Sequence, residues 1–302
     1  MNNKIKKSFG EHVFDFCNVV FMLVVMFVML YPFWNTVITS FNDARDSIRG
    51  SLFLWPRLPT LYNYEIVFKN KTLLNAGFIS VARTVLGTVL SVTLTFMLAY
   101  VLSVKAFLFR RFLNVFLVLT MYVNAGLIPT YFLFRDLGLL DSFWVYIIPN
   151  LVGAFNVIIL RTYISGLPDS YAEAAKIEGA SEIRIIFTII FPLSMPVIAT
   201  VALWVAVGQW NSWFDTYIFN PGSQNLSTLQ YEMMKILSSS MQMNSGNTPD
   251  YLSKQSGGPS NTVTPNSLRA AITVICTVPI LLVYPFLQKY FVKGVQIGGV
   301  KE

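Results

Sequence analysis

Apolar runs and polar segments alternate along this chain with a spacing that suits membrane-spanning helices. A helix needs about 20 predominantly apolar residues to cross the hydrocarbon core of a bilayer. Six runs meet that requirement, at residues 13–39, 76–104, 112–134, 143–163, 186–209 and 268–291. The pattern predicts an all-α, polytopic membrane protein in which residues 13–291 form one domain of six transmembrane helices.

Basic residues in the polar segments predict the orientation of these helices. Cytoplasmic loops of membrane proteins carry an excess of Lys and Arg. A cytoplasmic N-terminus produces that excess, because the inner segments then hold Lys4, Lys6, Lys7, Lys105, Arg110, Arg111, Arg161, Lys176, Arg184, Lys289, Lys293 and Lys301. We therefore expect cytoplasmic tails at 1–12 and 292–302, and outer loops at 42–75 and 210–267.

The segment 167–185 is amphipathic and charged, unlike the apolar runs on either side of it. Ser170 and Glu173 have the spacing of a capping box, in which two side chains satisfy free backbone N–H groups at a helix start. Gly179 stands where a helix can end in a left-handed residue, and Ser181 can cap a second short helix. We predict a helix–turn–helix elbow on the cytoplasmic side, between the fourth and fifth spans.

Three residues are unusual inside the apolar runs. Pro192 and Pro196 lie in the fifth run, where proline kinks a helix or frees backbone carbonyls. Arg83 lies seven residues from the start of the second run, and its burial as a free charge is costly. We expect its long side chain to snorkel to the outer interface; the alternative is that it faces a polar cavity.

Composition supports a membrane protein, because 54% of the 302 residues are hydrophobic and only 12% are charged. A typical soluble domain has about 25% charged residues. The net charge of +7 is spread between the apolar runs and forms no stripe, so we expect no nucleic-acid partner. The bilayer itself is the expected surrounding.

The sequence contains no recognisable catalytic, nucleotide-binding or metal-binding motif, so we expect neither an enzyme nor a cofactor. Cys17 and Cys276 lie in apolar runs, and the single His12 precedes the first run. Asp15 and Asp215 sit near the ends of spans, so the carboxylates that couple secondary transport to ions are not evident. Energy for transport would therefore come from a partner protein.

A family resemblance follows from the elbow. Glu173-Ala174-Ala175, then three residues, Gly179, nine residues, Ile189, one residue and Phe191-Pro192 resembles the EAA loop of ABC importer permeases. In that family the first helix of the loop docks in a groove on the ATPase subunit. The resemblance implies ATPase coupling by Glu173, Ala174, Ala175 and Gly179. The alternative is that Glu173 only completes its capping box and Gly179 only ends a helix.

Resemblance to the carbohydrate branch of this family extends over most of the chain. The resemblance rests on residues 31–33, 126–131, 137–140, 167–168 and 288–294. Within that branch, the chain is similar to the second permease subunit of maltose-type importers. Residues 124–131 and the tail are most similar to Gram-positive permeases for complex oligosaccharides, including pectin-derived ones. This resemblance implies an oligosaccharide substrate, a second permease, two ATPase subunits, an extracellular solute-binding protein and a bacterial plasma-membrane location. The tail 294–302 would reach toward the ATPase.

Sugar contacts would come from aromatic faces, amides and hydroxyls, because a sugar ring offers an apolar face and many hydroxyls. Residues of these kinds near the third and fifth spans are Tyr122, Asn124, Tyr131, Trp204, Gln209, Trp210, Asn211 and Trp213. The alternative for the aromatic members is an interfacial belt. Two other functions stay open: an ABC permease for a non-sugar solute, and a secondary transporter.

Overall fold

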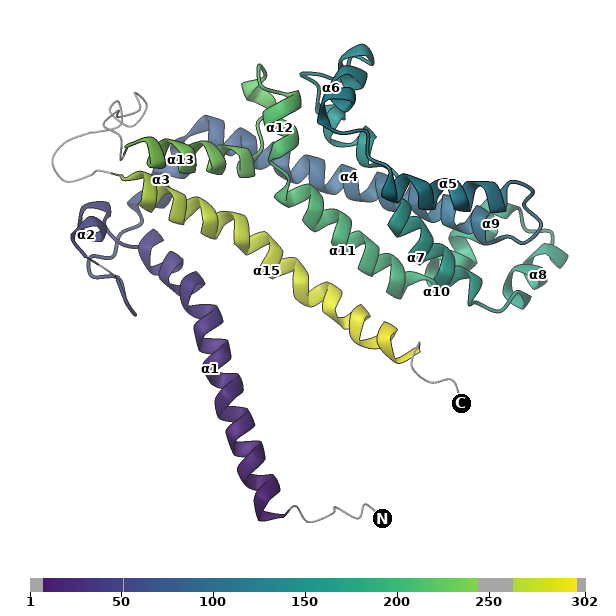
Figure 1. The fold of residues 1–302 in the computed structure, drawn as a ribbon, viewed down its shortest axis with the longest axis horizontal. Helices are drawn as coiled ribbons and strands as arrows, with labels where there is room; N and C mark the ends of the chain where they lie inside the picture. The colour runs from purple at the N-terminus through teal and green to yellow at the C-terminus, as the bar shows by residue number, and fades with distance from the viewer. Residues whose placement is uncertain (1–7, 51, 244–262, 298–302) are drawn as a thin grey trace. The chain divides into compact units, whose positions relative to one another are not determined.

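The computed structural model describes residues 8–50, 52–243 and 263–297, and the regular secondary structure of these parts is helical (Figure 1). The helices form two compact units. One comprises Met1–Lys69 and Ile236–Ile275, and the other comprises Asn70–Lys235 and Cys276–Glu302. Parts of the expected tails (1–7 and 298–302) and of the expected outer loop (244–262) lie outside the described residues.

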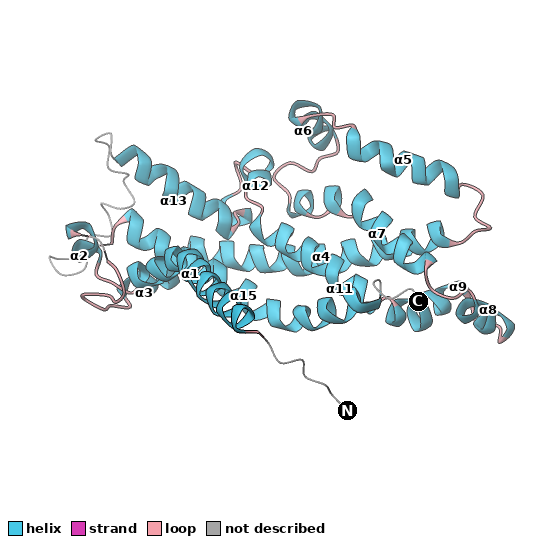
Figure 2. Cartoon of the chain, turned by 60° about the horizontal axis from the view of Figure 1, so that its bottom comes forward, coloured by secondary structure: helices cyan, strands magenta, loops and turns pink. Residues whose placement is uncertain are grey.

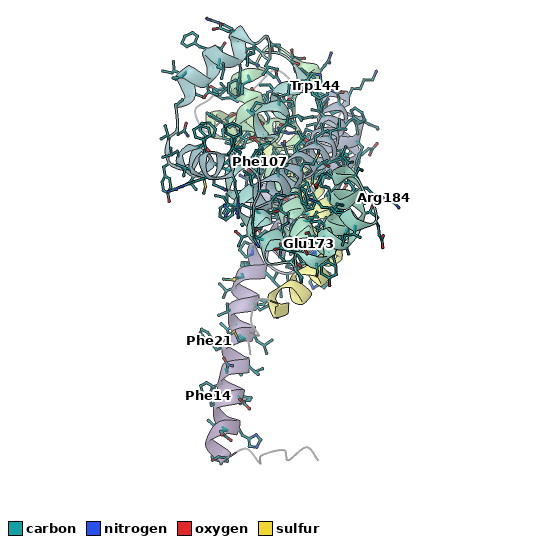
Figure 3. All side chains as sticks on the ribbon, turned by 90° about the vertical axis from the view of Figure 1, so that its right-hand side faces the viewer. Phe14, Phe21, Phe107, Trp144, Glu173 and Arg184 are labelled. Atoms are coloured by element: carbon teal, nitrogen blue, oxygen red, sulfur yellow. The ribbon has the colours of Figure 1, made fainter. Side chains whose placement is uncertain are left out.

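The first unit contains α1 (Phe9–Ser40), the expected first span. The Glu11 carboxylate accepts a hydrogen bond from the Ser8 N–H at 2.7 Å and so caps the start of the helix. The helix continues through Pro32 without a break. Its most apolar stretch is entirely unburied, and side chains such as Phe14 and Phe21 project outward from it (Figure 3). This apolar surface suits contact with lipid or with another membrane helix.

A buried asparagine organises the polar segment after α1. Asn42 is fully buried; its amide nitrogen donates to Asp46 and Ser47, and its amide oxygen accepts from the Leu58 N–H. These bonds hold α2 (Ala44–Arg49) against the loop that follows it. The segment then enters α3 (Tyr62–Lys69), where Asn63 donates to the carbonyl of Asn42. The expected outer loop therefore begins with a folded, hydrogen-bonded substructure.

The second unit is built around α4 (Lys71–Ser103), the expected second span. Asn70 caps this helix by accepting from the Thr72 and Leu73 N–H groups. Two further helices, α7 (Ala154–Ser165) and α11 (Met195–Asn211), pack along α4 (Figure 2). Their shared core contains the fully buried side chains Phe96, Leu102, Val157, Leu160, Ile185 and Val201.

Three of the expected spans are bent rather than continuous. The axes of α5 (Arg110–Tyr122) and α6 (Leu127–Asp136) meet at 119°. The short helices η1 (Phe143–Tyr146) and η2 (Ile148–Asn150) precede α7 with a bend of 46°. The described residues hold three continuous membrane-length helices, or up to six spans if each bent pair is one. The prediction of an all-helical, polytopic chain is confirmed.

The third bend lies where the sequence places two prolines. The elbow helix α9 (Glu182–Ile185) continues through a π-helical turn, η3 (Ile186–Ile190), into α10 (Phe191–Leu193). The chain then bends by 86° before α11, which has Pro196 in its first turn. Proline lacks the N–H that a continuous helix would need at that position but fits a first turn. The predicted kink is confirmed.

The remaining elements complete the two units. The elbow begins with α8 (Ser170–Ile177), and α12 (Phe214–Phe219) and η4 (Gln224–Leu226) follow α11. Two helices, α13 (Leu229–Met243) and α15 (Pro265–Ile297), each contribute to both units. Helix α15 contains the expected sixth span and runs past residue 291 into the expected C-terminal tail.

Candidate coupling elbow and polar cavity

The elbow has the predicted helix–turn–helix form, and hydrogen bonds explain its turn. Helix α8 ends at a glycine in the left-handed region, Gly179, with φ of 80°. The Gly179 N–H donates to the Lys176 carbonyl and the Ala180 N–H donates to the Ala175 carbonyl, each at 3.0 Å. This is the Schellman arrangement that closes a helix C-terminus. Ser181 then caps α9 by accepting from the Arg184 N–H, as predicted.

The capping box predicted at Ser170 and Glu173 is wrong. Helix α8 begins one residue earlier than expected, so Ser170 is already helical and Asp169 occupies the capping position. The Glu173 N–H bonds the Asp169 carbonyl within the helix. Among the described residues, the Glu173 carboxylate has no hydrogen-bond or ion-pair partner, and its side chain is exposed at the surface (Figure 3). Completion of a local cap therefore does not explain this carboxylate.

Helix α8 presents two different faces. Ala175 is buried in the core shared with α4 and α7, whereas Glu173 and Ala174 are exposed. Ile177, at the tip, is 88% exposed, and Tyr171 is also exposed. Sequence reasoning overlooked these two residues, although an apolar side chain on the polar face of a charged helix was the available signal. The outer face combines a carboxylate, a small residue and exposed apolar side chains.

Polar contacts fasten the elbow to the end of α4. The Lys176 ammonium pairs with Glu182 at 2.7 Å, across the turn between α8 and α9. The hydroxyl of Tyr100, a buried residue of α4, donates to the other Glu182 oxygen at 2.8 Å. Lys105, just beyond α4, pairs with Asp169 at 2.7 Å. These contacts connect the elbow to the C-terminal end of α4.

The expectation that Arg83 snorkels to the interface is wrong. Its side chain is 1% exposed and lies inside the second unit. The guanidinium binds the Asp215 carboxylate through two nitrogens, at 2.5 and 3.2 Å, and donates twice to the Gln209 amide oxygen. The ring of Tyr146 lies 4.4 Å from its central carbon. Arg83 is thus paired and stacked, which compensates for its removal from water.

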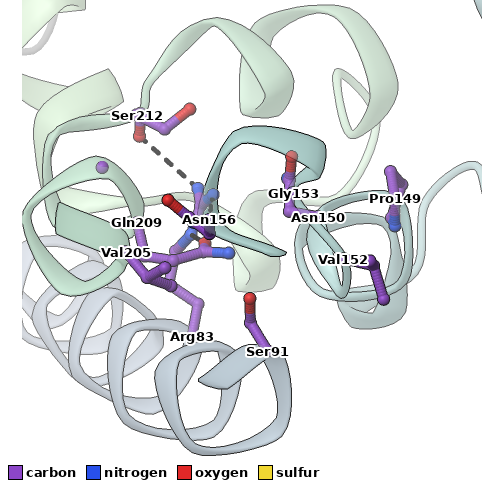
Figure 4. A pocket seen from close by; sticks show the side chains of 11 residues that line it. Arg83, Ser91, Pro149, Asn150, Val152, Gly153, Asn156, Val205, Gln209 and Ser212 are labelled. Carbon is purple, nitrogen blue, oxygen red and sulfur yellow. Dashed lines mark hydrogen bonds between the residues drawn. The ribbon is translucent and has the colours of Figure 1, made fainter. Parts of the chain in front are cut away.

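A cavity of about 350 Å³ adjoins this ion pair (Figure 4). Its walls come from the middle of α4, from the break between η2 and α7, and from the end of α11. The polar side chains and backbone that line it belong to Arg83, Ser91, Asn150, Gly153, Asn156, Gln209 and Ser212. Sequence reasoning overlooked Ser91, Asn150 and Asn156, although polar residues inside apolar runs were a usable signal.

Gln209 lies at the centre of this arrangement, as one of the predicted pathway residues. Its amide nitrogen donates to the Tyr146 carbonyl at 3.2 Å, while its oxygen accepts from Arg83. The Gln209 side chain packs against α4 at Gly87, where a Cβ atom added to the glycine would lie 3.0 Å from the Gln209 amide. An alanine at this position would press against the end of the Gln209 side chain. Gln209 also lines the cavity.

The other predicted pathway residues of the fifth span do not join that cavity. Trp210 is buried against α15, and its indole nitrogen donates to the Cys276 carbonyl at 3.0 Å. Trp204 is exposed beside Phe155, and Asn211 is exposed at the end of α11. Trp213 lies with Phe214 in an edge-to-face pair.

The predicted residues of the third span lie near the bend between α5 and α6. Tyr122 is 84% exposed at the end of α5. Asn124 forms part of the bend, since its side chain accepts from the Gly126 N–H at 2.8 Å. Tyr131 stacks on Phe219, which is a local packing contact. The structure therefore separates these residues from the Gln209 cluster, and they do not form one site in this chain.

Comparison with known proteins gives consistent matches over nearly the whole chain. The family described as the binding-protein-dependent transport system inner membrane component matches residues 1–297. Protein LplC of Bacillus subtilis is 37% identical, over 96% of this chain and 95% of its own length. The polygalacturonan/rhamnogalacturonan transport system permease protein YtcP of Bacillus subtilis is 34% identical, over 96% of this chain and 99% of its own length.

A solved structure resembles the fold closely. It is a crystal structure of a bacterial ABC transporter involved in the import of the acidic polysaccharide alginate, and one of its chains superposes with a TM-score of 0.86. That chain is 27% identical in sequence, and the match covers 95% of the present chain and all of the other.

Proposed function

Because the chain belongs to the family of binding-protein-dependent transport system inner membrane components, we propose that it is the permease subunit of an ATP-driven oligosaccharide importer. It acts in the bacterial plasma membrane with a second, similar permease, two ATPase subunits and an extracellular solute-binding protein. ATP is hydrolysed by the partner subunits. The sugar class follows the relatives, whose names refer to pectic and other saccharides.

The elbow is the observation that carries the coupling part of this proposal. Glu173 has no partner among the described residues, and Ile177 exposes an apolar side chain beside it. Within this chain, neither the exposed carboxylate nor the exposed apolar side chain forms a stabilising contact with a described residue. A groove on a partner would supply both a basic group and an apolar contact. Ala174 keeps the exposed face of α8 thin, and Gly179 sets the angle at which it is presented.

The polar contacts behind the elbow supply a route for motion. Closure of the ATPase subunits moves α8, and the bonds of Glu182 to Lys176 and Tyr100 pass that displacement to α4. Since α4 is the central helix of its unit, α7 and α11 move with it. The pathway then turns outward, and the binding protein releases its sugar into it. Gln209 is the pathway candidate that lines the polar cavity beside Arg83. The other candidates are proposed to line the pathway elsewhere or to contact the second permease: Tyr122, Asn124, Tyr131, Trp204, Trp210 and Asn211.

The test begins with purification of the tagged chain in mild detergent, followed by mass spectrometry of the proteins that accompany it. We expect an ATPase, a second permease and a binding protein. The complex is then placed in proteoliposomes, and uptake and ATP hydrolysis are measured together. Glu173→Ala combined with Gly179→Ala is expected to abolish uptake while ATP hydrolysis continues.

Glu178→Ala provides a matched control, because Glu178 is an exposed carboxylate at the end of the same helix. We expect it to leave coupling intact. Normal uptake by the Glu173 and Gly179 double variant would refute coupling through the elbow. Loss of uptake on dissipation of the proton gradient, with ATP still present, would instead establish a secondary transporter.

A further inference from the structure

The cavity beside Arg83 is lined by polar groups that have no partner in the described parts of the chain. The Ser91 side chain is buried, at 2% exposed, and its hydroxyl forms no hydrogen bond with any described residue. The Asn156 amide likewise has no hydrogen-bond partner within the described ranges. Both side chains line the same hollow, one from α4 and one from α7 (Figure 4). Asn156 is half-buried, so both side chains direct free hydrogen-bonding groups at the cavity, where a molecule that enters can bind them.

The backbone at the cavity supports the same reading. Helix η2 ends at Asn150 and α7 begins at Ala154, so the chain is irregular between them. Irregular backbone at membrane depth is tolerated where it is buried in protein or lines a cavity. The first N–H groups of α7 lack helical acceptors, as at every helix start. Gly153 keeps this opening clear, because a Cβ atom there would lie 3.2 Å from the Asn156 amide nitrogen.

The charge of the cavity defines what it can bind. Arg83 uses its five N–H donors in five hydrogen bonds, to Gln209, Ser212 and Asp215. The Asp215 carboxylate balances its charge at 2.5 Å. No free cation therefore faces the cavity from these described residues, and a carboxylate would find no ionic partner. Hydroxyl groups, which both donate and accept, match the serine and the amides.

The size of the cavity and its depth in the predicted span also suit the binding of a small molecule. A volume of about 350 Å³ lies within the range of small-molecule pockets, which begin at about 300 Å³. Pro149, Val152 and Val205 add apolar surface to the wall of the cavity. Ser91 falls near the middle of the second predicted span, at the depth where transporters commonly bind their substrates.

We propose that this cavity is a subsite for one sugar unit, bound through its uncharged hydroxyls by Ser91, Asn150, Asn156 and the first turn of α7. The proposal rests on the proposed function, and it deepens that function by giving this subunit its own saccharide contact. Arg83 and Asp215 do not bind the sugar. They hold Gln209 in place at the rim of the subsite.

Cysteine protection in the assembled complex tests this directly. Asn156→Cys is introduced into a Cys17→Ser/Cys276→Ser background, and the complex in nanodiscs is trapped with ATP and vanadate. A small methanethiosulfonate reagent is then added with and without neutral galactotetraose or acidic trigalacturonate. We expect the transported saccharide to slow modification at least about fivefold, because the reagent reaches the cysteine only while the site is unoccupied and that fraction falls as the saccharide exceeds its Kd. Gln224→Cys, exposed and outside the cavity, should be modified equally in both conditions.

A second measurement uses uptake at saturating binding protein. Ser91→Ala and Asn156→Ala should each lower the uptake rate about fivefold, while the affinity of the binding protein for sugar is unchanged. Thr93→Ala is the matched control, because Thr93 lies on the same helix and does not line the cavity. The loss should be the same for the neutral and the acidic saccharide.

The outcomes separate this proposal from the proposed function. Suppose that the wild-type complex takes up saccharide with ATP, that sugar does not protect the cysteine introduced by Asn156→Cys, and that Ser91→Ala and Asn156→Ala leave the uptake rate unchanged. The cavity then holds only water, and the subsite is refuted. A loss confined to the acidic saccharide also refutes it, since it would mean recognition of charge. Failure of the wild-type complex to take up any saccharide would overturn the proposed function itself.

Discussion

Removing one charge from the buried ion pair of the second unit should destabilise the chain strongly. Asp215→Asn keeps the size of the side chain and one acceptor oxygen but removes the charge that balances Arg83. The Arg83 side chain is 1% exposed, so bulk water solvates it poorly once the carboxylate charge is lost. The remaining neutral acceptors, Gln209 and the Ser212 carbonyl, are already bonded to it.

The expected size of the effect follows from this burial. Breaking a buried ion pair by removing one partner costs about 3–5 kcal/mol, because the other charge is left uncompensated. The amide oxygen that Asp215→Asn introduces would still accept one hydrogen bond from Arg83, so the lower end, about 3 kcal/mol, is appropriate. Arg135 and Asp136 form a comparable pair at the surface, where both side chains are more than half exposed. Asp136→Asn should cost less than about 1 kcal/mol.

The assay is thermal unfolding in detergent. The measured quantity is the fraction of protein that remains monodisperse after heating. Asp215→Asn should lower the midpoint by at least roughly 5 °C, whereas Asp136→Asn should leave it nearly unchanged. Adding Arg83→Gln to Asp215→Asn should recover part of the loss, because two neutral amides then replace the ion pair.

Equal midpoints for Asp215→Asn and Asp136→Asn would refute the reasoning. They would show that Arg83 is hydrated or paired differently in the membrane. The combination of Arg83→Gln with Asp215→Asn could also be less stable than Asp215→Asn alone. That result would contradict the argument, because it would show that the arginine stabilises the fold without its ion-pair partner.

Three further changes have defined expected outcomes. Gly87→Ala should shift the Gln209 side chain and cost about 1–3 kcal/mol of overpacking, reduced by the better helix propensity of alanine, as a lower thermal midpoint. Gly179→Ala should cost about 1–2 kcal/mol through its left-handed backbone and raise hydrogen exchange in α8, while Gly179→Asn should cost less. A hydrogen bond from Asn42, and then Arg57, lowers the pKa of Asp46. The stabilising effect of Asp46 is therefore complete above its unfolded pKa and is lost as pH falls through the lower folded pKa. Hydrogen-exchange protection in α2, measured against the intrinsic exchange rate at each pH, should fall at acidic pH.

The first of these changes has a control in the same helix, and the other two have outcomes that would contradict them. Gly77→Ala lies on α4 with nothing within 4 Å of the added methyl group, so it should not destabilise the helix. For the elbow, an unchanged exchange rate in Gly179→Ala would contradict the role given to its backbone. For α2, a pH dependence that persists in Asp46→Asn would assign the effect to another group.

Local features of the fold were predictable because their causes lie within a few residues. The continuous helices α1, α4 and α15 follow from apolar length alone. The turn at Gly179 and the cap at Ser181 follow from backbone and side-chain hydrogen bonds between neighbours. The capping box failed by one residue, since Asp169, directly after a proline, could serve as the helix start equally well.

Features that depend on contacts between distant residues were not predictable in the same way. Arg83 and Asp215 are 132 positions apart, and nothing near either residue identifies the other. Without that pairing, snorkelling was the cheaper outcome for an arginine near a span end. The breaks before α6 and α7 occur at Gly126 and Gly153, which were visible signals inside apolar runs. The prediction from length and hydropathy alone missed these two breaks.

The ion pair of Arg83 and Asp215 also bears on the electrical behaviour of the transporter. A charge that crosses the whole membrane potential does work of about 2.3 kcal/mol for each 100 mV. The two opposite charges lie 2.5 Å apart, Arg83 on α4 and Asp215 on α12, so a motion that keeps them paired carries no net charge. Their displacement currents cancel, so this part of the conformational cycle draws no energy from the membrane voltage.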